Sequence, residues 1–163
     1  MAKLHVKKIP QDYAERAVLV GVKRPNQQWP TESSLAELER LAQTAGAEVV
    51  ATTFQRLESP NPRTFIGSGK VDEVAQLCRS YAADLVIFDD ELTPSQQSNL
   101  EKQVGKDIKI IDRTALILDI FALHATSREG RLQVRLAQNE YLLPRLRGMW
   151  AHLASNRMGG GVG

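Results

Sequence analysis

The alternation of apolar and polar positions divides most of the chain into strands and helices. Apolar runs rich in β-branched residues predict four buried strands, at residues 17–22, 48–55, 84–90 and 108–112. Segments with helical periodicity separate these runs and predict three helices, over residues 32–46, 67–82 and 94–105. This alternation is typical of an α/β fold, here a small parallel sheet with flanking helices that is Rossmann-like in the loose sense.

Residue types at the helix ends support these boundaries. Thr31 is predicted to cap the start of the first helix, and Gly46 is predicted to end it. Thr93 and Pro94 suit an N-cap followed by a first-turn proline, and Gly105 closes the helix that they begin.

Residues 113–163 form a long helix-forming run that ends in a glycine cluster, and we predict one helical arm here. A heptad step defines two seam rows, the first with Leu136, Leu143 and Trp150 and the second with Leu118, Ala125, Leu132, Leu146 and Leu153. Asn139 is the polar exception, and Pro144 predicts a kink or a break. A helix of this length must project from a domain of this size, and its apolar stripe needs a partner.

We therefore divide the chain into a tail (1–16), an α/β subdomain (17–113) and a helical arm (114–163). Residues 1–113 carry 15 basic and 16 acidic side chains, whereas residues 114–163 carry six arginines against three acids. Arginine suits contact with phosphate, because its guanidinium binds two oxygens at once. From charge alone, a solvated helix face is an equally good interpretation.

Cysteine content and hydropathy limit the class of protein. Cys78 is the single cysteine, which excludes an internal disulfide, and its helical surroundings predict a small buried side chain. The first twenty residues lack the apolar core of a signal peptide, and no run approaches the roughly eighteen apolar residues of a membrane span. We expect a cytoplasmic protein without a membrane span.

A turn with a weak resemblance to a phosphate-binding loop precedes the second predicted helix. Gly67, Gly69 and Lys70 occupy a helix N-terminus, where backbone amides can hold a phosphate. The full loop needs G-x-x-x-x-G-K-[ST], but here its first glycine is absent and Val71 replaces its hydroxyl residue. A tight turn with a solvated Lys70 is the favoured interpretation.

Asp89, Asp90 and Glu91 follow the third predicted strand, at the edge where open α/β sheets place ligands. Their carboxylates suggest a Mg²⁺ site, but the sequence offers no second group of ligands, so a polar strand end is favoured. The histidines lack metal-ligand spacing, and no combination of residues indicates a catalytic centre. We predict no metal site and no catalytic machinery in this chain.

The distal arm is the best candidate for a functional site. It combines arginines, a stackable aromatic residue and a glycine cluster: Arg145, Arg147, Trp150, His152, Asn156, Arg157, Gly159, Gly160 and Gly161. Such residues suit folded RNA, through contacts to phosphates and exposed bases. Trp150 falls on a seam row, so we assign it to packing.

Five segments resemble, in order, the amino-terminal region of the HflX GTPases. They are TFIGSGKVDE (64–73), FDDELTPSQQSNLE (88–101), DRTALILDIFALHA (112–125), LQVRLAQNEYLLPRLRGMW (132–150) and the terminal GGGVG. The resemblance implies an α/β subdomain, two long antiparallel helices and then a Ras-like GTPase domain. It also implies binding to the large ribosomal subunit and a role in splitting or rescuing stalled ribosomes, with the loop between the long helices near the peptidyl-transferase region.

Compared with that family, this sequence ends inside the glycine loop. We therefore expect half of a two-helix hairpin, with GTP and Mg²⁺ sites only in a missing G domain and no cofactor in this chain. The resemblance implies ribosomal RNA contacts at Arg145, Arg147, His152, Ser155, Asn156, Arg157 and the glycines 159–161.

The resulting hypothesis is a ribosome-binding amino-terminal module of an HflX-type translation GTPase. Its expected partners are the large ribosomal subunit with its rRNA, the second arm helix, its own G domain and, through the exposed arm, a second copy of the chain. Two alternatives are a nucleotide-binding α/β domain that uses the turn at Gly67, Gly69 and Lys70, and a docking domain for the G domain.

Overall fold

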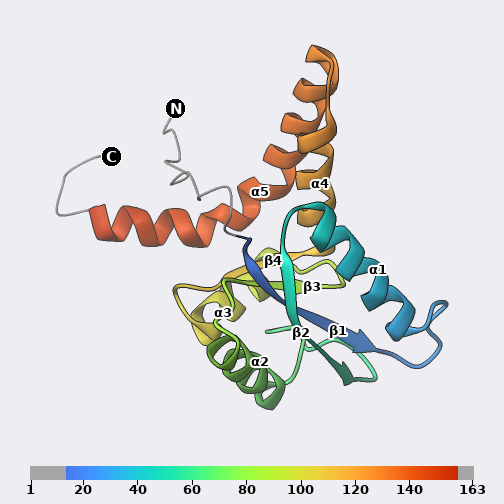
Figure 1. Ribbon diagram of the computed structural model, residues 1–163. Coiled ribbons are helices and arrows are strands. Elements are labelled where there is room, and N and C mark those ends of the chain that lie inside the picture. The colour runs from blue at the N-terminus through green and yellow to red at the C-terminus, as the bar shows by residue number, and fades with distance from the viewer. Residues whose placement is uncertain (1–13, 158–163) are drawn as a thin grey trace.

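The computed structural model describes residues 14–157, with side chains as far as Arg145. Its centre is a sheet of four parallel strands in the order β2-β1-β3-β4 (Figure 1). The strands are β1 (Arg16–Lys23), β2 (Glu48–Arg56), β3 (Leu85–Phe88) and β4 (Lys109–Asp112). The predicted α/β fold with a small parallel sheet is confirmed.

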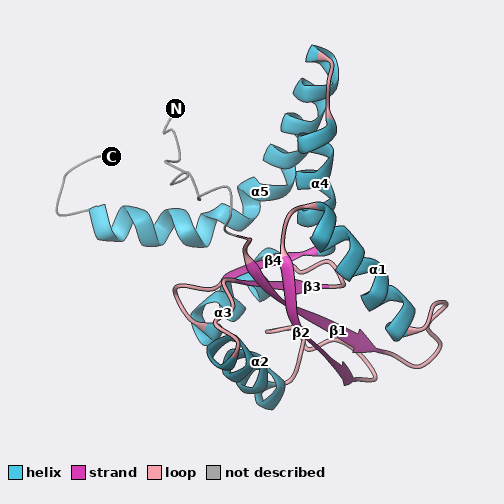
Figure 2. Ribbon diagram, viewed as in Figure 1, coloured by secondary structure: helices cyan, strands magenta, loops and turns pink. Residues whose placement is uncertain are grey.

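Helices cover both faces of this sheet (Figure 2). Helices α1 (Thr31–Thr44) and α4 (Arg113–His124) pack on one face, and α2 (Ser68–Ser80) and α3 (Pro94–Val104) pack on the other. The last helix, α5 (Arg128–Arg157), contacts both α4 and α3. None of the helices in the described range is at once long and apolar enough to cross a lipid bilayer.

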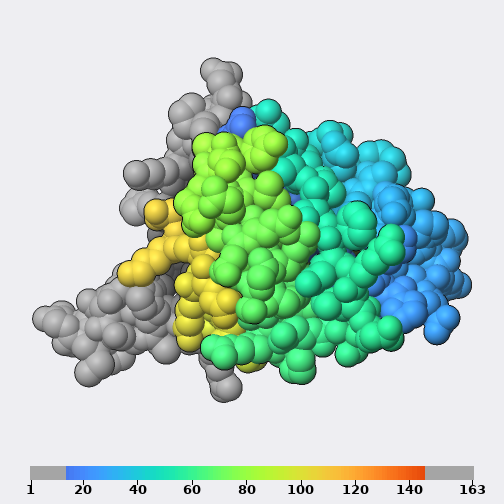
Figure 3. Space-filling model, turned by 90° about the horizontal axis from the view of Figure 1, so that it is seen from below, coloured from blue at the N-terminus to red at the C-terminus, as the bar shows by residue number. Residues whose placement is uncertain are grey.

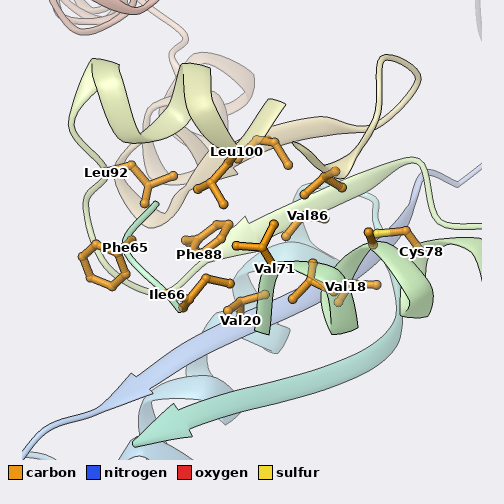
Figure 4. Close-up of a cluster of buried hydrophobic side chains, with 14 of the residues drawn as sticks. Val18, Val20, Phe65, Ile66, Val71, Cys78, Val86, Phe88, Leu92 and Leu100 are labelled. Atoms are coloured by element: carbon orange, nitrogen blue, oxygen red, sulfur yellow. The ribbon is translucent and has the colours of Figure 1, made fainter. Parts of the chain in front are cut away.

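The alternating side chains of β1 supply two separate cores, because successive residues of a strand point to opposite faces. Leu19 lies with Leu38 of α1 in the core under α1 and α4. Val18 and Val20 lie in the other core, together with Val71, Phe88, Leu100 and the buried Cys78 (Figure 4). The predicted burial of Cys78 is confirmed. Each fully buried aliphatic side chain contributes about 1.5–3 kcal/mol to folding.

The start of α3 is as predicted. The Thr93 hydroxyl accepts a hydrogen bond from the backbone N–H of Gln96 at 3.1 Å, and the Gln96 side chain accepts one from the Thr93 N–H at 2.9 Å. Pro94 follows in the first turn, and Gly105 ends the helix with φ +140°. This reciprocal capping box satisfies two N–H groups that would otherwise lack partners.

The predicted cap of α1 is wrong. Pro30 occupies the N-cap position, and Thr31 is the first helical residue. The Thr31 hydroxyl donates to the side-chain oxygen of Gln27 at 2.9 Å, so it holds the preceding loop instead of the helix N-terminus. Gly46, at φ +90°, follows the last turn as predicted, in a conformation that a glycine adopts without strain.

The prediction of one continuous arm helix is also wrong. Helix α4 ends at His124, Ala125 has extended backbone (φ −67°, ψ 121°), and α5 begins at Arg128. The Ser127 hydroxyl accepts a hydrogen bond from the N–H of Gly130 at 2.9 Å, which satisfies a free donor in the first turn of α5. The chain therefore reverses, and the first part of α5 lies beside α4 (Figure 1).

This reversal changes the interpretation of the heptad seam. Leu118 lies in α4 and Leu132 in α5, so the second seam row does not run along a single helix. Leu132, Leu136 and Leu143 of α5 remain 56%, 60% and 65% exposed. Three apolar side chains of the predicted stripe are thus exposed within the described side chains, whereas the prediction of a continuous seam is wrong.

Candidate functional site

The carboxyl ends of the parallel strands share one edge of the sheet, which we call the carboxyl edge, and charged residues collect there. Arg24 follows β1, Asp89 and Asp90 follow β3, and Asp112 ends β4 directly before Arg113. Open α/β sheets bind ligands at this edge, so the partners of each charge decide whether a ligand site is present.

Asp89 is engaged in a network between α1 and α4. Arg113 donates to it through Nε at 2.9 Å and through a second guanidinium nitrogen, and the Ser34 hydroxyl donates to its other oxygen. Arg113 also contacts Glu37 at 3.2 Å and the Ser34 carbonyl at 3.0 Å. The Asp89 side chain is only 9% exposed, so this carboxylate joins helices and has little access to solvent.

The other two acids have different partners. Arg24 lies 3.4 Å from Asp90, with its guanidinium 5.5 Å from the centre of the Phe65 ring. Burial raises the pKa of the Asp90 carboxyl, an effect that the Arg24 charge partly offsets. Glu91 is mostly exposed and lies 3.9 Å from Arg145. Among the residues with described side chains, no three His, Cys, Asp or Glu residues lie close enough together to bind a metal ion. These residues therefore do not support the Mg²⁺ hypothesis.

Gly67 is the N-cap of α2, and Gly69 and Lys70 belong to its first turn. Helix α2, in green, forms part of the surface shown in Figure 3. The Gly67 N–H donates to the side-chain oxygen of Gln55 at 2.9 Å. Lys70 forms an ion pair with Glu73 and its side chain is 15% exposed, so the prediction of a solvated lysine is wrong. Two groups on which the phosphate hypothesis depends are therefore already engaged within the chain.

A third cluster lies where the arm meets the subdomain, and we call it the arm base: Asp112, Leu92, Tyr141 and Arg145. Asp112 is fully buried. One of its oxygens accepts from the Ala115 N–H at 3.0 Å and so caps α4. The other accepts from the Leu92 N–H at 2.9 Å and from the Tyr141 hydroxyl. One carboxylate thus connects β4, α4, the segment before α3, and α5.

Burial, together with the hydrogen bond to Asp112, raises the pKa of the Tyr141 hydroxyl well above its ordinary value. The hydroxyl therefore stays protonated and donates to the carboxylate over the whole neutral range. Neither Asp112 nor Tyr141 was identified from the sequence. Asp112 did carry a signal, because an aspartate directly before an apolar helical run is a favoured N-cap.

Arg145 is packed against the subdomain. Its guanidinium lies 3.6 Å from the centre of the Tyr141 ring, and it donates to the carbonyl of Leu92 and, at 2.9 Å, to the carbonyl of Tyr141. With a side chain 8% exposed, Arg145 is not the free surface arginine that an RNA contact requires. The Arg145 side chain thus makes contacts within the chain, and this arrangement does not support the predicted RNA contact.

The other predicted RNA contacts stay predictions. The side chains of Arg147, His152, Ser155, Asn156 and Arg157 lie outside the described side chains, although these residues belong to α5. The glycines 159–161 lie outside the described residues altogether.

The sequence and the fold of this chain match those of a class of GTP-binding proteins. Residues 32–122 match the family described as GTP-binding GTPase N-terminal, and residues 124–163 match the GTP-binding GTPase middle region. The chain belongs to this family of GTP-binding GTPases, and it corresponds to the amino-terminal part of HflX.

Two relatives illustrate the similarity. GTPase HflX of Alkalihalophilus pseudofirmus is 51% identical over 155 residues, which cover 95% of this chain and 36% of the relative. GTPase HflX of Escherichia coli is 40% identical over 152 residues, which cover 93% and 34%. The chain therefore spans about a third of the length of these curated relatives, and the resemblance to the HflX family is confirmed.

A solved structure supports the fold. A GTP-binding protein from the archaeon Sulfolobus solfataricus, in complex with GDP, superposes with a TM-score of 0.62 at 23% identity. The superposition covers 90% of this chain and 43% of the archaeal protein.

Proposed function

We propose that this chain is the ribosome-binding amino-terminal module of an HflX-type translation GTPase, acting in the cytoplasm. In this proposal the arm contacts ribosomal RNA of the large subunit, while GTP hydrolysis belongs to a G domain outside this chain. The whole protein would use this contact to split or rescue stalled ribosomes under stress. The observation that carries the proposal is a basic helical arm that leaves a compact subdomain, in a chain of the HflX family.

The charge distribution supports the arm as the RNA-binding part. The subdomain pairs many of its charges internally, as the contacts of Asp89 and Asp90 illustrate. The arm has twice as many arginines as acids, with Arg147 and Arg157 in the distal half of α5. Cationic side chains that displace counterions from RNA give binding that weakens as salt rises.

Binding to purified large ribosomal subunits tests the proposal. We expect Arg147→Ala/Arg157→Ala to weaken binding at least about tenfold at low salt, and to reduce the slope of log affinity against log salt by about 1.4 to 1.8. Arg128→Ala/Arg131→Ala is the matched control, because it removes the same charge from exposed positions in the first turns of α5. Equal binding by both double variants and by the unsubstituted chain would refute the role of the distal arm.

A further inference from the structure

Pro144 lies inside helix α5 and interrupts its backbone hydrogen bonding. Proline has no backbone N–H, so the carbonyl of Glu140 loses its usual intrahelical donor at this turn. Helix α5 also changes direction along its length, and its distal part leaves the subdomain (Figure 1). The backbone bonds of the helix therefore do not by themselves fix the direction of the distal part.

The two residues that bracket this turn are both attached to the subdomain. Tyr141 donates its hydroxyl to Asp112, and Arg145 donates to the carbonyl of Leu92. Being four residues apart, they lie on the same face of the helix, and the Arg145 guanidinium stacks 3.6 Å from the Tyr141 ring centre. Arg145 also donates to the Tyr141 carbonyl at 2.9 Å, which adds a bond across the turn that contains Pro144.

The attachment points belong to the rigid part of the molecule. Asp112 and Leu92 are both fully buried, and the Leu92 N–H donates to Asp112 at 2.9 Å. Leu92 belongs to the core shared by β1, β3, α2 and α3 (Figure 4). A close-packed core allows little displacement, so these two points hold Tyr141 and Arg145 in one arrangement.

We propose that Tyr141 and Arg145 form a clamp across Pro144 that fixes the direction in which the distal part of α5 leaves the α/β subdomain. They act as positioning residues for the RNA contact, and this part of the inference rests on the proposed function. Without the clamp the distal part samples several directions. The apparent affinity for the large subunit then falls in proportion to the fraction of molecules with the productive direction, about fivefold for a fraction of roughly one fifth.

Distances between two spin labels measure the clamp directly and without a ribosome. The labels replace Glu39, which is exposed on α1, and Ala151 in the distal part of α5, in a chain with Cys78→Ala. We expect one narrow distance distribution for this chain. We expect a broad or shifted one when Tyr141→Phe and Arg145→Met are combined, because the hydroxyl and guanidinium contacts are then lost.

Two control substitutions make the same chemical changes elsewhere. Tyr81→Phe removes the hydroxyl of a 45% exposed tyrosine, and Arg135→Met removes a guanidinium from an exposed position on α5. Both should leave the distance distribution unchanged. An unchanged narrow distribution in the Tyr141→Phe/Arg145→Met variant overturns the clamp.

Large-subunit binding by the same variants tests the consequence for function. A broadened distribution together with weaker binding supports the whole inference. A broadened distribution with unchanged binding overturns the positioning role while the clamp itself stands. If the unsubstituted chain does not bind the large subunit, the proposed function fails, and the label distances still decide whether the clamp exists.

Discussion

Removal of the Asp112 carboxylate is the sharpest perturbation of the arm base. Its three hydrogen bonds reach Ala115, Leu92 and Tyr141, and all come from one fully buried side chain. Asp112→Ala leaves the donors behind while removing their acceptor. This differs from removing both partners of a bond, because a buried donor without an acceptor costs its full desolvation energy.

The expected size of the effect follows from these contacts. Loss of an N-cap costs about 1 kcal/mol, and a stranded buried N–H at Leu92 costs about 1–3 kcal/mol. The lost bond from Tyr141 adds about 1.5 kcal/mol, since the acceptor is charged. We therefore expect Asp112→Ala to lower the free energy of unfolding by roughly 4 kcal/mol, a large share of the 5–15 kcal/mol that is typical of a domain.

Equilibrium unfolding in urea measures this change. With a slope of about 2 kcal/mol/M, the midpoint should fall by about 2 M. The urea midpoint of Asp112→Asn should lie between those of the unsubstituted chain and Asp112→Ala. The amide keeps one acceptor oxygen and places a donor where the other oxygen was. Asp107→Ala, an exposed aspartate on the loop before β4, should stay within about 0.5 kcal/mol. A loss below about 1 kcal/mol for Asp112→Ala, at unchanged slope, would refute the reasoning.

Three further predictions concern the arm. Ser127→Ala should cost about 1 kcal/mol and speed amide exchange in the first turn of α5, because the N–H of Gly130 loses its acceptor; unchanged exchange there would contradict this. Light scattering should show concentration-dependent self-association that Leu136→Gln/Leu143→Gln abolishes, since both leucines are at least 60% exposed; a chain that is monomeric at every concentration would exclude it. Folding raises the pKa of Tyr141, so the stability that this hydroxyl contributes is present below about pH 10 and should decline as the pH rises further. The decline should be less steep in Tyr141→Phe. Identical urea midpoints for the two chains at every pH would rule this out.

The strands of the sheet could be predicted closely because each one is marked by a run of consecutive apolar residues. The run at residues 17–22 corresponds to β1 (Arg16–Lys23), since a strand buried on both faces needs apolar side chains at nearly every position. The predicted run at 84–90 is longer than β3 because Asp89 and Asp90 leave the sheet for ion pairs with Arg113 and Arg24. Such partners lie far away in the sequence, so a strand pattern does not reveal them.

The arm was harder to predict, because apolar spacing continued through the place where the helix ends. The second seam row passed over the turn at Ala125, although Ser127 carried a recognisable N-cap signal. The contacts that direct α5 are non-local: Tyr141 meets Asp112 across 29 residues, and Arg145 meets Leu92 across 53. Charge and periodicity do not encode contacts between elements so far apart.

A comparison of Arg145 with Arg147 tests this argument, because the sequence predicts the same RNA contact for both arginines. Arg145 lies on the Tyr141 face of α5 and is buried, so its substitution by Met should weaken large-subunit binding by misdirecting the arm. The number of phosphate contacts would not change, and the salt dependence should stay as it was. Arg147→Met should instead remove one phosphate contact and lower the salt slope by about 0.7 to 0.9. A lower slope for Arg145→Met, with none for Arg147→Met, would reverse the two roles and restore the direct RNA contact to Arg145.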